Sequence, residues 1–392
     1  MNKPIIITLS YVFIQAVLHN LGHVITPVYV NQYDIPSYMF GFFFSAMSLG
    51  LLIGAPIWGV LGDQRNQKPL IFLGLIGYSI GQVLFVSTTN LFLMTFFRFF
   101  SGFSVSAAIT LILSQLINLS PNERRATYLT MHAALFAFGT TIGYKLGGVL
   151  GDYFIKEVFY VQAVLNIFYA FYVFFTFKEL LRSETHKKES FIKGLKDVSK
   201  MDSSLLIFLL ALTLATTSAT ILQRYLDVFV TVDLNKSPNE LGDLVLVTGV
   251  VGAITNFIIV PLLLKLKKDY TIMKWLQILS AITIFIVFRS ERIIIALYTG
   301  YMFYIVLKSI FQPLEQNYIS LSARGEKYGA IMGVRQAFFS FGMVLGPLIA
   351  GFLYDYNPIL VFDVSAVMFI LAFFLLLMSQ KSLKRRKDLQ HL

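Results

Sequence analysis

Long, uninterrupted runs of apolar residues alternate with short polar stretches along the 392-residue chain. A helix that crosses the hydrocarbon core of a bilayer needs about 20 mostly apolar residues. The runs are continuous and show no alternation with a period of two, so they favour helices over a β-barrel. Twelve runs of this kind are predicted as spans: residues 4–30, 38–61, 70–88, 91–117, 127–151, 157–177, 204–231, 240–264, 271–288, 293–317, 328–353 and 358–378.

The composition indicates that lipid is the solvent of these runs. The chain is 56% hydrophobic and only 14% charged, whereas a soluble domain is nearer to about 25% charged. The first run is longer than the apolar region of a signal peptide and contains Gln15, His19 and His23, so we do not expect it to be removed. The chain has no cysteine, which excludes disulfides, thiol nucleophiles and cysteine metal sites; no metal site or cofactor is predicted.

The net charge of +11 is unevenly distributed between the connections. The N-terminus, the even-numbered connections and the C-terminal tail carry 23 Lys and Arg residues, and the odd-numbered connections carry 4. By the positive-inside rule both termini lie in the cytoplasm of a multi-pass cell-membrane protein. Because topology accounts for the basic charge, nucleic acid is not an expected partner. The basic tail, residues 381–392, is expected to lie on anionic lipid headgroups.

The two halves of the chain resemble each other. Residues 137–153 align with residues 340–356 at an offset of 203, and one long polar connection lies between the halves. The sequence therefore predicts an all-α membrane protein of two pseudo-symmetric six-helix bundles, expected to be a monomer, with a binding site between the bundles near the middle of the membrane. The predicted parts are a bundle over 1–178, a cytoplasmic linker over 179–203, a bundle over 204–380 and the tail over 381–392.

Three motifs carry a family resemblance: GVLGDQRNQKPL at 59–70, RFFSG at 98–102 and GTTIGYKLGG at 139–148. They resemble signatures of the major facilitator superfamily, and the last is similar to the signature of its twelve-helix drug:proton antiporter branch. The first motif implies a cytoplasmic latch in which an aspartate meets the N-terminus of helix 11, where exposed N–H groups favour an anion. The predicted latch residues are Gly59, Asp63, Arg65 and Lys68.

The resemblance also implies roles within the spans. Arg98 corresponds to an arginine that the superfamily links to proton coupling; pairing with a carbonyl group or snorkelling to the surface is the alternative. Tyr144 stands where the antiporter signature has a proline. Lys145 points away from the glycine face and is expected to reach the central cavity, with snorkelling as its alternative. The glycine face should abut a partner helix, as should its counterpart in the second half; the predicted packing residues are Gly139, Gly143, Gly147, Gly148, Gly346 and Pro347.

Charges inside the spans are costly and by default suggest function. Arg224 can pair with Asp227 three residues on, and Lys308 and Glu315 share a helix face. A structural ion pair is the alternative for the first two, and a place near the cytoplasmic mouth is the alternative for Glu315. Predicted proton-coupling residues are Arg98, Asp227 and Glu315; predicted substrate-binding residues are His19, His23, Lys145, Arg224, Lys308, Gln312 and Arg335.

His19 and His23 are four residues apart, which predicts that they lie on one helix face, and histidines can titrate at a useful pH; the alternative is a purely hydrogen-bonded role. Five in-span cations outnumber the in-span carboxylates Asp227, Glu315 and Asp363, which favours an anionic or zwitterionic substrate. The chain is therefore predicted to be a secondary transporter, not an enzyme, that exports a small amphipathic or anionic compound (a drug, metabolite or metallophore) in exchange for protons. An importer or uniporter of an organic anion is the alternative, and a lipid-modifying membrane enzyme is a remote one.

Overall fold

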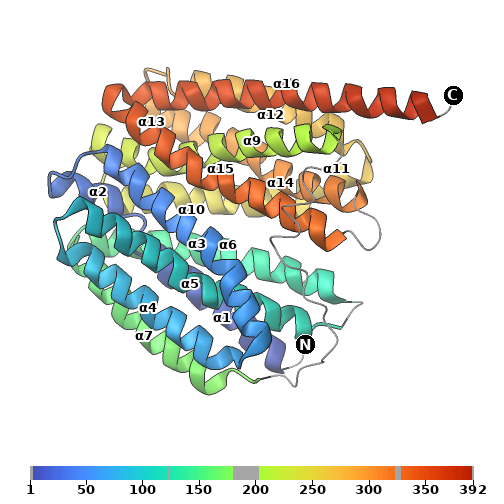
Figure 1. Cartoon of the computed structure of the whole chain (residues 1–392). Coiled ribbons are helices and arrows are strands. Elements are labelled where there is room, and N and C mark those ends of the chain that lie inside the picture. The colour runs from blue at the N-terminus through green and yellow to red at the C-terminus, as the bar shows by residue number, and fades with distance from the viewer. Residues whose placement is uncertain (1–2, 122–123, 180–202, 323–327, 391–392) are drawn as a thin grey trace. The chain divides into compact units, whose positions relative to one another are not determined.

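The computed structural model describes residues 3–121, 124–179, 203–322 and 328–390, and the regular elements in these ranges are all helices (Figure 1). Eleven of them are long and apolar enough to cross a membrane, within the described residues. The remaining predicted run, 4–30, is divided between α1 (Lys3–Asn20) and α2 (Thr26–Gln32). The division follows from the polar residues near the end of α1 and from Pro27, which is placed at the start of a new helix.

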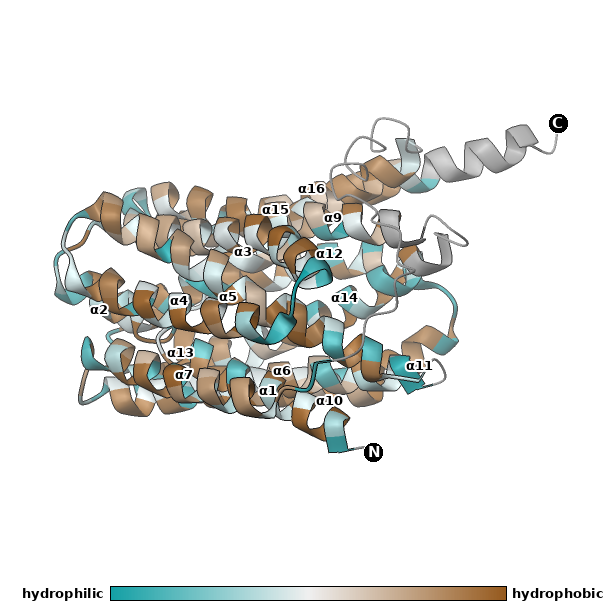
Figure 2. Ribbon diagram, turned by 60° about the horizontal axis from the view of Figure 1, so that its bottom comes forward, coloured by the Kyte–Doolittle hydropathy of each residue, from teal (hydrophilic) through white to brown (hydrophobic). Residues whose placement is uncertain are grey.

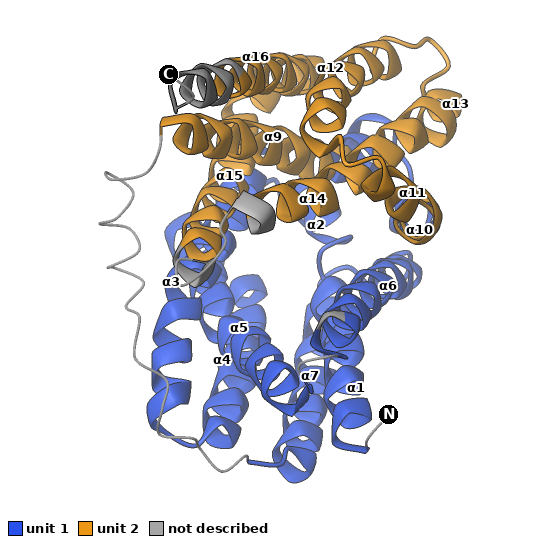
Figure 3. Ribbon diagram, turned by 90° about the vertical axis from the view of Figure 1, so that its right-hand side faces the viewer, with its two compact units in different colours: residues 1–185, 227–249 blue, residues 186–226, 250–392 orange. Residues whose placement is uncertain are grey.

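The chain forms two compact units (Figure 3). Unit 1 comprises residues 1–185 and 227–249, and unit 2 comprises residues 186–226 and 250–392. The contacts thus group 227–249, a segment of the second half of the sequence, with the first half, which the sequence did not predict. Nearly all of the predicted linker, 179–203, lies outside the described residues.

Unit 1 contains the helices of the first half and a helical segment from the second. After α1 and α2 come α3 (Tyr38–Gln64), α4 (Gln67–Ser87), α5 (Leu91–Leu119), α6 (Arg125–Gly151) and α7 (Glu157–Thr176). The segment 227–249 contains the end of α9 (Ser203–Val228), a π-helix (Phe229–Asp233) and most of α10 (Pro238–Ile254).

Helices α1 and α6 approach closely along a stripe of glycines, which leaves no room for side chains. A Cβ atom on Gly139 would lie 2.7 Å from the carbonyl oxygen of Phe13. Gly143 and Gly147 face the carbonyl oxygens of Val17 and Leu21 in the same way, one helical turn and two turns further on. The interface therefore depends on the absence of side chains at these positions.

Unit 2 repeats this packing. A Cβ atom on Gly342 or Gly346 of α15 (Tyr328–Tyr356) would lie 2.8 Å from the carbonyl oxygen of Thr213 or Thr217 of α9. The next residue, Pro347, accepts a hydrogen bond from the Tyr225 hydroxyl at 3.4 Å.

The elements of unit 2 are the first part of α9, the end of α10 with a π-helix (Thr255–Ile259), α11 (Val260–Lys265), α12 (Asp269–Val287), α13 (Ile293–Ala296), a π-helix (Leu297–Tyr301), α14 (Met302–Ser322), α15 (Tyr328–Tyr356) and α16 (Pro358–Gln390).

Apolar side chains lie both inside the units and on their outer faces. Buried residues such as Phe208, Met273 and Leu314 form the core of unit 2. Large apolar side chains such as Phe168 and Ile286 are instead 67% and 63% exposed, and polar residues gather at helix ends and in connections (Figure 2). A surface of this kind is stable in lipid rather than in water, so the chain is a multi-pass membrane protein.

Candidate transport site

Arg98 is the central cation of a polar cluster inside unit 1. Its side chain is only 3% exposed, and its guanidinium donates to Gln82 Oε1 at 3.2 Å and to Thr26 Oγ1 at 3.1 Å. The guanidinium also lies over the Phe85 ring, 3.8 Å from its centroid. Arg98 therefore points into the bundle, and its role in proton coupling stays a prediction.

The two histidines lie on different segments. His19 is on α1, and its ring is tilted by 41° against that of Tyr78, with ring centroids 4.4 Å apart. His23 lies in the turn that follows α1, 5.1 Å from the Phe44 ring and 6.5 Å from the Tyr144 ring. They do not share the helix face expected from their spacing, because α1 ends at Asn20.

Asp227 is a buried carboxylate near the end of α9, and it accepts a hydrogen bond from α6. Its side chain is 2% exposed, and the Tyr144 hydroxyl donates to its Oδ2 at 3.1 Å. Tyr144 is the residue that replaces the proline of the antiporter signature, so this departure from the family pattern supplies a hydrogen-bond donor. The predicted Arg224–Asp227 pairing stays a prediction.

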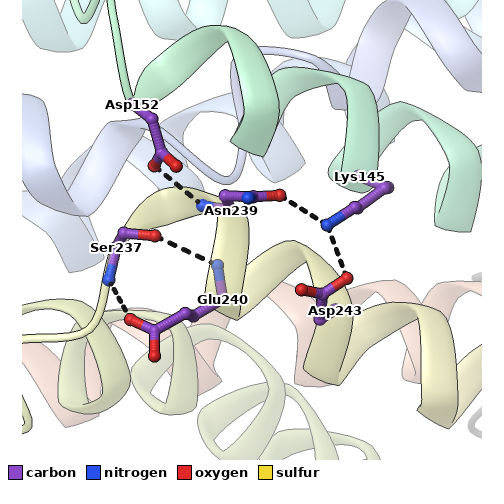
Figure 4. A network of polar contacts seen from close by, with 6 residues as sticks. All are labelled: Lys145, Asp152, Ser237, Asn239, Glu240 and Asp243. Atoms are coloured by element: carbon purple, nitrogen blue, oxygen red, sulfur yellow. Dashed lines mark hydrogen bonds and ion pairs between the residues drawn. The ribbon is translucent and has the colours of Figure 1, made fainter.

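Lys145 binds polar groups at the start of α10 (Figure 4). Its Nζ donates to Oδ1 of Asn239 and to Oδ1 of Asp243. The Asn239 N–H in turn donates to Asp152 Oδ1 at 3.2 Å. Lys145 is thus bound to a carboxylate of the chain itself, and an anionic substrate would have to compete with Asp243 for it.

The segment that carries Asp243 packs tightly on α6. A Cβ atom on Gly242 would lie 3.1 Å from Cα of Lys145, and one on Gly148 would meet the backbone of Pro238. Gly249 faces Thr141 further along α10. Gly148, predicted to pack beside the other glycines of α6, therefore contacts the start of α10 rather than α1.

In unit 2, Glu315 and Arg335 form a buried ion pair. Arg335 Nε donates to Glu315 Oε1 at 2.8 Å, and a terminal guanidinium nitrogen donates to Oε2 at 2.6 Å. The two side chains are 0% and 5% exposed. Lys308, expected on the same face as Glu315, instead donates to Gln223 Oε1 of α9 at 3.1 Å, and the side chain of Gln312 is exposed.

The predicted latch residues lie around the connection between α3 and α4. Asp63 and Arg65 are exposed, and the Lys68 ammonium lies 4.5 Å from the centroid of the Phe174 ring. At Gly59 an added Cβ atom would make only an ordinary contact, 3.8 Å from Thr110. The expected contact of Asp63 with the N-terminus of helix 11 would join the two units, and it stays a prediction.

The sequence prediction did not count Asp243 among the carboxylates inside the spans, although this residue falls within the run 240–264. Asp243 pairs with Lys145, and Glu315 pairs with Arg335. In the described part of the chain Lys145 and Arg335 thus have carboxylate partners. The addition of Asp243 makes the excess of positive charge inside the spans smaller than the sequence predicted. A search of every run for Asp and Glu would have found Asp243, but Tyr144 and Gln82 gave no signal apart from the position of Tyr144 in the glycine motif.

Long apolar helices with charged and polar groups buried between them define a multi-pass membrane transporter. The profile described as Major Facilitator Superfamily matches residues 7–232 and 203–391, so the chain belongs to this superfamily. It is therefore a transporter rather than an enzyme, as the sequence predicted, and members of this superfamily carry small molecules.

Curated relatives and solved structures agree with this assignment. The chain is 24% identical over 357 residues to the quinolone resistance protein NorA of Staphylococcus aureus (strain COL), covering 91% of each protein. It is 23% identical to multidrug resistance protein 2 of Bacillus subtilis (strain 168), covering 90% of this chain and 89% of that protein. The fold is similar to that of a point mutant of the nucleoside transporter NupG, with a TM-score of 0.81 at 13% identity, covering 96% of this chain and 100% of that one.

Proposed function

We propose that the chain exports a small amphipathic compound, anionic or zwitterionic, from the cell in exchange for protons by alternating access. The names of the two relatives, a quinolone resistance protein and a multidrug resistance protein, support export, since about nine-tenths of the chain aligns with each. We place the protein in the cell membrane with both termini in the cytoplasm, on the distribution of basic residues.

The observation that carries proton coupling is the burial of Asp227 inside a span with the Tyr144 hydroxyl bound to it. A carboxylate in this position can gain a proton when it is shielded from water and lose it when water reaches it. Glu315, the other predicted carrier, is held by two hydrogen bonds from Arg335. Protonation of Glu315 would break an ion pair inside the bundle, so we assign the exchanged proton to Asp227.

The cations of the spans favour an acidic group on the substrate. Arg224 and Lys308 are predicted substrate-binding cations, as are Lys145 and Arg335, which form ion pairs with Asp243 and Glu315. A lipophilic compound with a carboxylate would satisfy both the apolar lining of such a site and a cation within it.

One observation favours the alternative, an importer or uniporter of an organic anion. Tyr144 occupies the place of the proline that is part of the antiporter signature, so the motif that implies export is incomplete. Measurements on membranes of known orientation distinguish the two directions of transport.

Inverted and right-side-out vesicles from cells that produce the protein test the proposal. We expect a quinolone acid to accumulate in inverted vesicles when their interior is acid, and accumulation to stop when an ionophore collapses the pH gradient. Asp227→Asn should abolish this accumulation, whereas Asp363→Asn, at a carboxylate paired with Arg289, should keep it. Uptake only into right-side-out vesicles would support the importer, and gradient-independent uptake would remove proton coupling.

A further inference from the structure

Unit 2 contains a pocket between α9, α12, α14 and α16. Its empty space is about 280 Å³, counting the part that is open to the outside. The room inside it for water-sized groups is only about 30 Å³, whereas pockets that enclose a whole drug-sized ligand usually hold about 300–1,000 Å³. This pocket therefore accommodates only a small terminal group of such a molecule. Its walls are mostly apolar and include Leu276 and Phe311, and its polar residues are Gln277, Ser280, Tyr304 and Lys308.

Two of these polar groups are buried without a hydrogen-bond partner among the described residues. They are the Gln277 side-chain oxygen and the Tyr304 hydroxyl, on side chains that are 2% and 1% exposed. An unsatisfied buried polar group costs about 1–3 kcal/mol, and buried polar groups of folded proteins are nearly always bonded. Both groups line the pocket, so an occupant of the pocket can satisfy them.

The chemistry of the lining specifies this occupant. The Tyr304 hydroxyl and the Lys308 ammonium are hydrogen-bond donors. The Gln277 atom without a partner is the amide oxygen, and a half-turn about the last bond of this side chain would present its NH₂ group instead. No carboxylate belongs to the lining. A group of donors without a neighbouring carboxylate binds an oxyanion rather than a cation. The Leu276 and Phe311 side chains would contact the hydrocarbon part of the same ligand.

We propose that this pocket binds the carboxylate end of an amphipathic organic acid, with Tyr304, Gln277 and Lys308 as its donors. The role of the pocket in export rests on the proposed function, since the acid bound here would be the exported compound. Only the end of the molecule fits inside, and the rest would extend out of the pocket.

Thermal unfolding of the purified chain in detergent tests binding without any need for transport. The probes are three carboxylic acids, each paired with its methyl ester: a medium-chain fatty acid, an arylacetic acid and a quinolone acid. A ligand that binds the folded state raises Tm, and at a fixed concentration the rise grows with the logarithm of its affinity. We expect at least one acid to raise Tm more than its ester does.

Loss of one hydrogen bond to the carboxylate should weaken binding about tenfold. Tyr304→Phe and Gln277→Leu should therefore each remove most of the difference between acid and ester. Tyr270→Phe is the matched control, because it removes a hydroxyl that donates to the Leu376 carbonyl in the same unit, away from the pocket lining. If Tyr304→Phe does not fold, Lys308→Gln provides the same test.

The proposal is overturned if no acid stabilises the wild type more than its ester, as when the pocket holds water alone. It is also overturned if Tyr304→Phe, Gln277→Leu and Lys308→Gln all keep the difference. A chain that binds acids but exports nothing contradicts the proposed function only. A chain that exports compounds without any preference for acids over esters contradicts this inference only.

Discussion

The buried pair of Glu315 and Arg335 allows a quantitative prediction. Removal of one partner leaves the other charged and unpaired inside the bundle, because the two side chains are 0% and 5% exposed. The cost of such a change is about 3–5 kcal/mol, whereas replacement of both partners by apolar residues of similar size is often neutral or stabilising. Arg335→Met and Glu315→Leu should thus each destabilise the chain strongly, and the double variant should recover.

Thermal unfolding in detergent measures this effect. A change of 1 kcal/mol shifts Tm by about 2–4 °C in a chain of 150–250 residues and by less in a longer one. We therefore expect each single variant to lose about 5 °C and the double variant to return to within about 2 °C of the wild type. The pair of Arg289 and Asp363, whose side chains are 41% and 27% exposed, is the control. The hydrogen bond with Asp363 raises the pKa of Arg289. Arg289→Met should nevertheless change Tm far less, because the carboxylate it leaves unpaired is 27% exposed, whereas Glu315 is fully buried.

A double variant as unstable as either single variant would refute this reasoning, since the cost would then not come from an unpaired charge. Transport by the double variant adds a separate readout. If the pair serves only stability, a recovered double variant should transport at the wild-type rate; if Glu315 carries the proton, it should be stable and inactive.

Three further predictions follow from the other contacts. Asp227→Asn should lose proton-driven transport but keep exchange of labelled for unlabelled substrate at equal pH, and loss of both activities would assign Asp227 to substrate binding instead. Gly143→Ala should lower the free energy of unfolding by about 1–3 kcal/mol, because its new methyl group would meet a carbonyl oxygen of α1. Gly333→Ala has nothing within 4 Å of its new Cβ atom and should be neutral or stabilising by up to about 1 kcal/mol. Equal effects of the two variants would show that close packing is not the cause. Lys145→Ala should change the free energy of unfolding by less than about 1 kcal/mol, because the ion pair of Lys145 is partly exposed. The same substitution should increase maleimide labelling of a Thr141→Cys variant several-fold. Unchanged labelling would mean that the ion pair does not hold α10 on α6.

The architecture could be predicted from the sequence because it follows from local patterns. Each span is a run of about 20 apolar residues, and a helix is the conformation that satisfies its own backbone in lipid. The contact of the α6 glycines with a neighbouring helix also follows from the period of the sequence, since a step of four residues lies on one face. The first run was the exception, because the polar residues near Asn20 and the proline at position 27 divide it between two helices.

Tertiary structure alone decided which buried groups meet. Lys145 and Asp243 are 98 residues apart, and Tyr144 and Asp227 are 83 apart; no local periodicity relates such positions. Even Glu315 and Arg335, 20 residues apart, meet only because α14 and α15 bring them together. Charge, length and spacing along the chain showed which polar side chains enter the membrane, but their partners depend on helix packing, which brings distant segments within the 3 Å range of a hydrogen bond.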